Sequence, residues 1–423
     1  MRHARVAAIA ASFVCAFLSA AAMAGDNSYN GYDHDGERHE RGDPSISVGV
    51  RPMFLVSGMH DSWLKRKLES CQNDLVRRTN FSIAHRGAPL QLPEHTKEAY
   101  EAGARMGAGV VECDVTFTKD GALVCRHDEC DLATTTNIVN TPLNASCTTP
   151  WSGAGSGPRC CTSDLTLTQF KSLKGKMDAS NPAATTAEGF LGGTPDFRTN
   201  LYTSRGTLLT LRESIALNRK LGVKHTPELK AGNPARVNAV FGSQEKYAQA
   251  MIDEFKRAGV DPRDVYAQSF NLADILYWIR HEPRFGRQAV YLDDVDPGAG
   301  IPRLTVAELQ SLHQNNVRIF APPIPALLAV DDSTNTLVPS QYARDIKAAG
   351  LDIITWSFER ADLRRGAAFG GFYAAYDPEG KVVKTDSDMY FALDVLARDV
   401  RVIGVFSDWP ATVSYYASCL GFD

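Results

Sequence analysis

Short apolar runs alternate with longer amphipathic stretches through most of the chain beyond residue 80. The runs have the length of buried strands, and the stretches between them carry apolar side chains at helical spacing. The expected strands lie at 81–85, 109–115, 223–229, 265–270, 288–293, 317–321, 352–358 and 402–407. The expected helices lie at 94–106, 211–221, 243–259, 271–281, 305–314, 340–349 and 387–398.

This alternation predicts an α/β fold. Strands that alternate with helices favour a parallel sheet, and eight such strands favour its closure into a (β/α)8 TIM barrel. The alternative is an open, doubly wound sheet, but no glycine-rich nucleotide loop follows the first strand. A further helix is expected at Asp61–Cys71, where it would close the bottom of the barrel or pack beside it.

One segment breaks the alternation. The tetrapeptide Thr-Lys-Asp-Gly at 118–121 joins 112–117 to 122–127. A loop this short cannot connect neighbouring parallel strands, so the chain is expected to reverse there as a hairpin. The reversal would bring His127 roughly opposite Asp114.

Residues 129–206 form a long polar insertion, rich in Thr, Ser, Gly, Pro and Asn. A segment of this length at the catalytic face of a barrel is usually a lid or a substrate-binding subdomain. It carries Cys130, Cys147, Cys160 and Cys161. Disulfides would hold it together where it lacks a core of its own.

The beginning of the chain has the pattern of an export signal. Within residues 1–24, basic positions precede an alanine-rich apolar stretch and the small-x-small sequence Ala22-Met23-Ala24. A transmembrane anchor is the alternative, but the apolar run is short. Residues 25–45 are polar and without period, which predicts a disordered leader before a barrel domain at 46–423. We expect a periplasmic or extracellular protein without a stable membrane anchor.

Export changes how the cysteines are interpreted. Cys15 lies within the expected signal, so eight of the nine cysteines remain afterwards. An even number in an oxidising compartment suggests disulfides, whose connectivity stays open. A zinc site is the weaker alternative, because no C-x-x-C pair has a second pair of ligands. The net charge of −4 gives no reason to expect nucleic acid as a partner.

Ionisable residues gather at the ends of the expected strands. Glu112 and Asp114 are two positions apart and therefore share one face of a strand, and Glu228 ends the next strand along. Carboxylates brought this close need a cation or a raised pKa. An all-oxygen site of this kind suits one divalent cation, Mg²⁺ or Ca²⁺.

Two histidines and two cations complete the set. His85 ends the first expected strand and His127 ends the hairpin. Cleavage of a phosphodiester needs a base and an acid, and histidine can serve as either near neutral pH. Arg86 and Lys230 would supply positive charge for the phosphate oxygens. These residues predict a metal-dependent phosphodiesterase.

Several short sequences, in this order and spacing, resemble the glycerophosphodiester phosphodiesterase family over about residues 80 to 416. They are H-R-G-A at 85–88, P-E-H-T at 93–96, V-E-C-D-V at 111–115, T-K-D-G at 118–121, R-H-D at 126–128 and P-E-L-K at 227–230, followed by Gln268-Ser269-Phe270, Trp356 and Ser407-Asp408-Trp409-Pro410. The resemblance implies an enzyme that hydrolyses glycerophosphodiesters, with glycerol 3-phosphate and an alcohol as products.

The resemblance also implies roles at the matching positions. His85 and His127 would be the acid/base pair, and Glu112, Asp114 and Glu228 would hold the cation. Arg86 would bind phosphate, Glu94 would orient Arg86 or its loop, and Lys230, Phe270 and Trp356 would line the pocket. His95 is expected to be structural, and His225 to face away from Glu228.

The chain departs from the family pattern at Ser407, where threonine is usual, and around Trp356, where an asparagine is missing. The long insertion leaves the substrate range open. Two rival functions are a sphingomyelinase D-like phospholipase acting on lipid and a secreted binding protein without turnover. The lid at 129–206 lacks an obvious amphipathic helix for a membrane surface, which favours the soluble substrate.

Overall fold

The structure is a computed structural model that describes residues 45–296 and 300–423. The expected signal peptide at 1–24 lies outside the described residues, as does the expected leader apart from Ser45. None of the helices in the described part of the chain combines the length and the apolar character needed to cross a bilayer.

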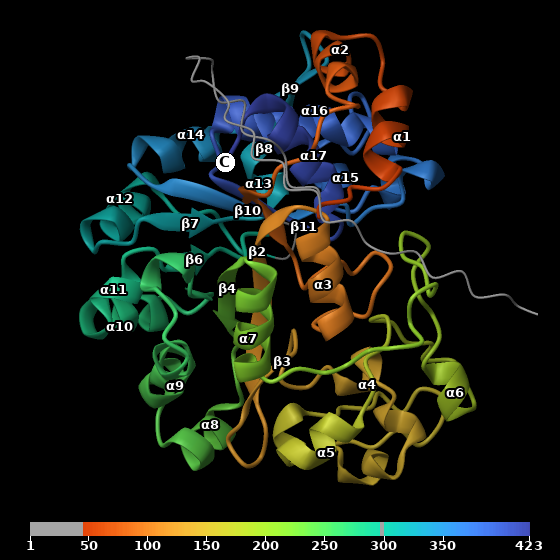
Figure 1. Ribbon diagram of the computed structural model, residues 1–423, viewed down its shortest axis with the longest axis vertical. Helices are drawn as coiled ribbons and strands as arrows, with labels where there is room; N and C mark the ends of the chain where they lie inside the picture. The colour runs from red at the N-terminus through yellow and green to blue at the C-terminus, as the bar shows by residue number, and fades with distance from the viewer. Residues whose placement is uncertain (1–44, 297–299) are drawn as a thin grey trace, which may run out of the picture. The chain divides into compact units, whose positions relative to one another are not determined.

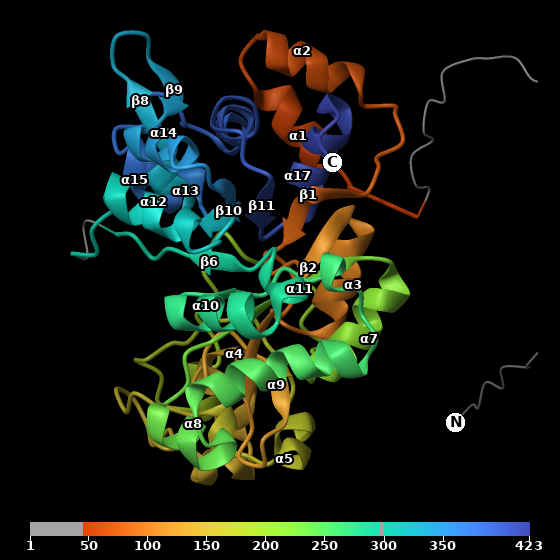
Figure 2. The same cartoon turned by 90° about the vertical axis from the view of Figure 1, so that its left-hand side faces the viewer.

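Parallel strands close into a barrel (Figures 1 and 2), because β11 pairs with β1 and β1 pairs with β2. The expected TIM barrel is therefore confirmed and the open sheet was the wrong alternative. In their order around the barrel, the strands are β1 (Thr79–Ala84), β2 (Ala108–Phe117), β4 (Lys224–Leu229), β5 (Gln268–Ser269), β6 (Val290–Leu292), β7 (Ile319–Ala321), β10 (Asp352–Phe358) and β11 (Gly404–Ser407).

Each expected helix lies between two barrel strands. These helices are α3 (Lys97–Arg105), α7 (Leu211–Leu221), α9 (Gln244–Arg257), α10 (Leu272–His281), α12 (Val306–Gln314), α14 (Gln341–Ala348) and α16 (Met389–Asp394), the last continued by a π-helical segment at Val395–Val400. Helix α7 shows why they begin where they do: Thr210 caps its first turn in a capping box with Glu213. It ends at Gly222, whose φ of +67° suits glycine.

Several elements lacked a clear signal in the sequence. Helix α17 (Pro410–Leu420) is one of them, because residues on all its sides are buried and its sequence has no polar face. The others are α1 (Arg51–Gly58), α8 (Pro234–Phe241), α11 (Pro283–Gly286), α13 (Ile324–Leu327), α15 (Phe372–Tyr376) and the hairpin of β8 (Leu328–Asp331) with β9 (Thr336–Pro339).

The expected helix near residue 65 is α2 (Trp63–Ser70), capped by Ser62. It packs beside the barrel, against α1 and α17 (Figure 2). A disulfide between Cys71 and Cys419 joins the end of α2 to the end of α17. The segment before the first strand is thus held to the last helix of the chain.

The expected hairpin is confirmed as β2 and β3 (Leu123–Cys125), which pair antiparallel with Val115 opposite Cys125. The Arg126 backbone N–H donates to the Asp114 carbonyl at 2.7 Å, so His127 lies one residue beyond the position opposite Asp114. A disulfide between Cys113 and Cys125 crosses this hairpin. Both cysteines lie in the hydrophobic layer between the barrel and its helices, as expected for Cys113.

The insertion holds short helices after β3: α4 (Leu132–Thr135), α5 (Leu167–Ser172) and α6 (Ala187–Phe190). Disulfides join Cys130 to Cys161 and Cys147 to Cys160. Contrary to the expectation, the insertion also has a hydrophobic cluster of its own, in which Leu132, Phe170 and Phe190 are buried. All eight cysteines of the described residues are disulfide-bonded, which confirms the disulfides and leaves none for zinc.

His225 on β4 is buried on the outer side of the barrel wall, as expected from its spacing to Glu228. Its ring lies 5.3 Å from the Phe255 ring, and its Nδ1 lies 3.3 Å from Nδ2 of Asn218. Burial lowers the pKa of His225 from 6.5 to about 4. The folded protein therefore holds this imidazole neutral at pH values where the unfolded chain would protonate it.

This burial predicts an acid-sensitive contribution to stability. Because the folded pKa is depressed, the stabilising contribution is present above pH 6.5 and is lost as pH falls toward 4. Urea unfolding at about pH 7.5 and about pH 4.5 should show that His225→Leu removes about 2 to 3 kcal/mol of the pH-dependent loss. An exposed histidine, His281, replaced in the same way is the control. An unchanged pH dependence in His225→Leu would contradict the assignment.

Candidate active site

Three carboxylates meet inside the carboxyl end of the barrel. Glu112 and Asp114 share one face of β2, and the β2–β4 register sets Glu228 beside Asp114. All three side chains are buried, and one oxygen from each lies within 4.8 Å of the others. The structure thus brings together the three residues expected to hold a cation.

The charges of these carboxylates are only partly compensated. Burial and the neighbouring carboxylates raise the pKa of Glu112 well above its usual range. Burial also raises the pKa of Glu228 to about 7, against the opposing effect of Lys230. Burial acts in the same direction on Asp114, but His95, Lys230 and His127 together outweigh it and lower the pKa of that carboxyl. A divalent cation among the three would favour their charged forms.

The donor atoms fit such a cation. Oδ1 of Asp114 is buried and has no hydrogen-bond partner among the described residues, whereas Oδ2 is held by His95 at 2.8 Å. Buried polar atoms are rarely left without a partner. Three carboxylates without nitrogen or sulfur ligands match the oxygen preference of Ca²⁺ and Mg²⁺.

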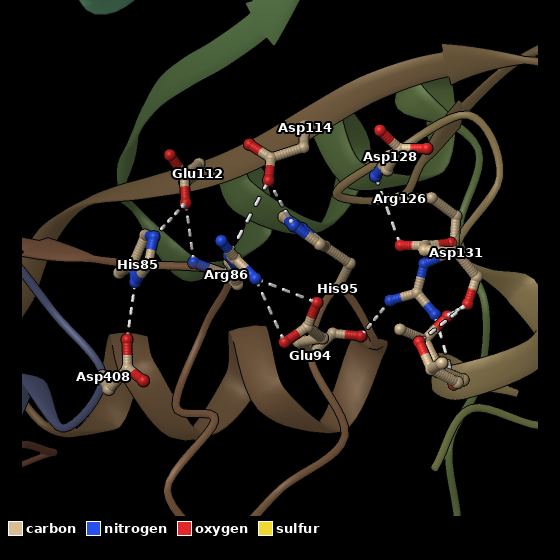
Figure 3. Close-up of polar contacts among 12 residues, drawn as sticks. His85, Arg86, Glu94, His95, Glu112, Asp114, Arg126, Asp128, Asp131 and Asp408 are labelled. Atoms are coloured by element: carbon tan, nitrogen blue, oxygen red, sulfur yellow. Dashed lines mark hydrogen bonds and ion pairs between the residues drawn. The ribbon is translucent and has the colours of Figure 1, made fainter. Parts of the chain in front are cut away.

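His85 is oriented by a carboxylate from the last barrel strand (Figure 3). Its Nδ1 lies 2.5 Å from Oδ1 of Asp408, and its Nε2 lies 3.9 Å from Oε2 of Glu112. A carboxylate at Nδ1 favours the proton on that nitrogen and leaves the Nε2 lone pair facing the carboxylate cluster. Burial lowers the pKa of His85 to about 4, although Asp408 opposes the shift.

His127 reaches the same cavity from the end of the β2–β3 hairpin. It lines that cavity together with His85 and the three carboxylates. Burial, followed by the nearby positive charges of Arg86 and Lys230, lowers the pKa of His127 well below its usual range. Both histidines expected to exchange protons therefore line one small cavity, His85 from the end of β1 and His127 from the end of the hairpin.

Arg86 follows His85 in a left-handed conformation, with φ of +54°. Its backbone N–H donates to Oε2 of Glu112 at 2.8 Å, and its Nη1 lies 3.2 Å from Oε1 of Glu94 (Figure 3). Its Nε lies 3.9 Å from Oδ2 of Asp114. Glu94 thus makes the contact that its expected supporting role requires, and the guanidinium is held beside the carboxylate cluster.

The remaining expected residues form one wall of the cavity. Lys230 Nζ lies 2.7 Å from Oε1 of Glu228 and 5.7 Å from the centre of the Phe270 ring. Phe270 in turn meets Trp356 edge to face at 5.9 Å. The cavity enclosed by these side chains and the ionisable residues has a volume of about 50 Å³. It is the size of a small group such as a phosphate, not of a whole diester.

Two further residues hold the carboxylates in place. His95, expected to be merely structural, donates from Nε2 to Oδ2 of Asp114 at 2.8 Å. Its Nδ1 lies 2.9 Å from Oη of Tyr100. Gln268 on β5 donates from Nε2 to Oε1 of Glu112 at 2.9 Å. Both lie in sequences that resemble the family, which is the signal that could have marked them.

Arg198 of the insertion contacts the carboxylates around the site, although no motif in the sequence marked it. The Arg198 side chain is 2% exposed, and its Nη2 lies 3.4 Å from Oδ2 of Asp408 and 3.7 Å from Oε2 of Glu94. Arg198 therefore joins the carboxylate that orients His85 to the carboxylate that contacts Arg86. Arg360, after β10, approaches the same oxygen of Asp408 at 3.7 Å.

Comparison with known proteins gives a consistent assignment. The profile of the Glycerophosphoryl diester phosphodiesterase family matches residues 85–412. A protein of Arthroderma benhamiae named as an extracellular protein is 44% identical over 248 residues, which are 57% of this chain and 99% of that protein. A glycerophosphodiester phosphodiesterase of Arabidopsis thaliana is 26% identical over 241 residues, which are 54% of this chain and 58% of that protein.

A solved structure supports the fold alone. The crystal structure of a Silicibacter pomeroyi protein assigned as a glycerophosphoryl diester phosphodiesterase superposes with a TM-score of 0.53 at 18% identity. The match covers 80% of this chain and 95% of that one. The barrel is thus shared even where the sequences have diverged widely.

The carboxylate cluster predicts a removable divalent cation. Calorimetric titration of metal-free protein with Ca²⁺ and with Mg²⁺ should show binding that Asp114→Asn weakens by about tenfold or more, because a charge and a free oxygen are lost. His95→Asn should weaken binding less, since it removes only the support of Asp114. Asp332→Asn, an exposed carboxylate in the β8–β9 turn, is the control. Equal affinity in Asp114→Asn would rule out this cluster as the cation site.

Proposed function

The chain belongs to the glycerophosphoryl diester phosphodiesterase family, and we propose that it hydrolyses glycerophosphodiesters to glycerol 3-phosphate and an alcohol. One observation carries the proposal: His85, His127 and a buried triad of carboxylates face a single small cavity. Hydrolysis of a phosphodiester needs proton transfer on two sides of the phosphorus and positive charge at its oxygens. The cavity contains groups for both requirements.

Positive charge would reach the substrate from two directions. Arg86 offers a planar guanidinium beside Asp114, and Lys230 offers an ammonium beside Glu228. Glu112, Asp114 and Glu228 would hold one Ca²⁺ or Mg²⁺, which when bound supplies charge to the non-bridging phosphate oxygens. Phe270 and Trp356 would then exclude water from the far side of the cavity.

The two histidines would divide the proton transfers. His85 presents Nε2 to the cavity because Asp408 occupies Nδ1, so it can take or return a proton there. His127 faces the same space from the hairpin and would handle the second proton. One histidine activates the nucleophile and the other protonates the departing alkoxide. The nucleophile is either water or the neighbouring hydroxyl of the substrate. In the second case, the reaction would form a cyclic phosphate, which water would then open.

We propose the following organisation for the whole chain. Residues 1–24 act as a signal for export to the periplasm or the extracellular medium, and 25–45 form a leader before the barrel domain at 46–423. Four disulfides support an oxidising location. The insertion at 129–206 acts as a subdomain at the catalytic face.

The direct test is release of glycerol 3-phosphate from glycerophosphocholine, with EDTA, Ca²⁺ or Mg²⁺. His85→Ala and His127→Ala should each lower kcat by about 100-fold or more, because each removes one proton transfer. His281→Ala serves as an exposed control, and melting curves check that the variants fold.

Folded, metal-loaded protein without activity on any glycerophosphodiester would contradict the proposal. In that case, release of a cyclic phosphate from sphingomyelin or a lysophospholipid would instead support the sphingomyelinase D-like function. Absence of turnover on all of these substrates would support a binding protein.

The contacts of Arg198 predict a role in positioning. Arg198→Met should lower kcat by about tenfold with little change in KM, because Asp408 and Glu94 lose the cation that joins them. Arg198→Lys should recover part of the loss. Arg205→Met, an exposed arginine of the same insertion, is the matched control. A change in KM with unchanged kcat would contradict positioning through His85.

A further inference from the structure

A second, larger cavity adjoins the catalytic one. Its volume is about 510 Å³, within the usual range for small-molecule sites. The two cavities share Glu228, Lys230 and Phe270 as wall residues. The larger one continues between the segment that follows β4 and the segment that follows β5.

We propose that this cavity binds the departing alcohol and that it selects head groups carrying a positive charge, such as ethanolamine or choline. The inference rests on the proposed function and adds the substrate class. Apart from Glu228 and Lys230, which line both cavities, its walls hold none of the residues assigned to proton transfer or to the cation.

The catalytic cavity is too small for a whole diester. The catalytic cavity, at about 50 Å³, holds a phosphate-sized group, so at least one arm of a diester must extend beyond it. The shared wall residues make the larger cavity a neighbouring space into which such an arm can extend. Since the larger cavity can hold more than a glycerol, it suits the arm that varies among glycerophosphodiesters.

The wall of the larger cavity carries more negative than positive side chains. Among the charged side chains that line the larger cavity, Lys230 is already paired with Glu228 at 2.7 Å. Asp128 and Asp274 also line it, and among the described residues neither forms an ion pair with a lysine or arginine. The wall therefore carries uncompensated negative charge, which favours a cation over a neutral or anionic group.

Asp274 is a buried carboxylate that has no cationic partner among the described residues. It is 3% exposed, and its carboxylate accepts hydrogen bonds only from neutral groups among the described residues, Gln244 Nε2 at 3.0 Å and Ser269 Oγ at 2.9 Å. Burial raises the pKa of Asp274, although these hydrogen bonds oppose the shift. A buried carboxylate without a cationic partner is costly, and an ammonium group in the cavity would supply that partner.

Asp128 would supply the second carboxylate. It is exposed, and its Oδ1 accepts the Cys130 backbone N–H at 2.7 Å. Cys130 is bonded to Cys161, so the turn that carries Asp128 is tied to the insertion. Replacement by asparagine would keep this turn, because an amide oxygen can accept the same hydrogen bond.

The test compares head groups in the metal-loaded enzyme. Glycerophosphoethanolamine and glycerophosphocholine carry a cation, whereas glycerophosphoglycerol and glycerophosphoinositol do not. Asp128→Asn and Asp274→Asn should each raise KM for the cationic diesters by about five- to tenfold and leave the neutral diesters unchanged. Asp332→Asn is the control. Equal KM changes for charged and neutral diesters would overturn charge selection.

A binding measurement separates this inference from the hydrolase proposal. In metal-loaded His85→Ala, choline chloride and ethanolamine should raise the melting temperature more than glycerol or myo-inositol, and Asp274→Asn should abolish the difference. Turnover without head-group preference, together with no selective amine binding, would overturn the cavity assignment while the hydrolase proposal stands. Selective amine binding without turnover of any diester would support the cavity assignment and contradict the hydrolase proposal.

Discussion

Burial of three carboxylates within 4.8 Å of one another is the constraint on which the site depends. Pairing of β2 with β4 sets Asp114 beside Glu228, and the alternation of β2 adds Glu112 on the same face. Charges of one sign at this separation repel strongly when water is excluded. The surrounding residues can be understood by how they offset that repulsion while leaving one side open for a cation and a substrate.

The compensation comes in two layers. Arg86, Lys230, His95 and Gln268 touch the carboxylates directly, each by a hydrogen bond or an ion pair. Behind them, Glu94 and Asp408 hold Arg86 and His85, and Arg198 joins these two carboxylates. Along the path from Asp114 through Arg86 and Glu94 to Arg198, charges therefore alternate in sign, so that each buried charge has an opposite one beside it.

The insertion takes part in this arrangement as more than a cover. Its two disulfides and the hydrophobic cluster beneath them hold it together, and its Arg198 is buried beside Asp408 and Glu94. The disulfide between Cys113 and Cys125 acts at a second point, because it links the strand of the carboxylates to the hairpin that ends at His127. Disulfides thus restrain both the insertion that carries Arg198 and the hairpin that carries His127.

The sequence by itself predicted the barrel and the hairpin, and it placed near one another the ten residues expected at the site. Hydrophobic period is a local property, and in a parallel barrel the ends of the strands converge, so residues at those ends can be placed together in advance. Only the tertiary structure decided the disulfide pairing, the contact of His85 with Asp408, 323 residues away, and the entry of Arg198. These contacts join distant segments through packing, and no local period or spacing encodes which distant side chain will fill a given space. Helix α17 illustrates the same limit, because a helix buried on all sides has no amphipathic pattern to reveal it.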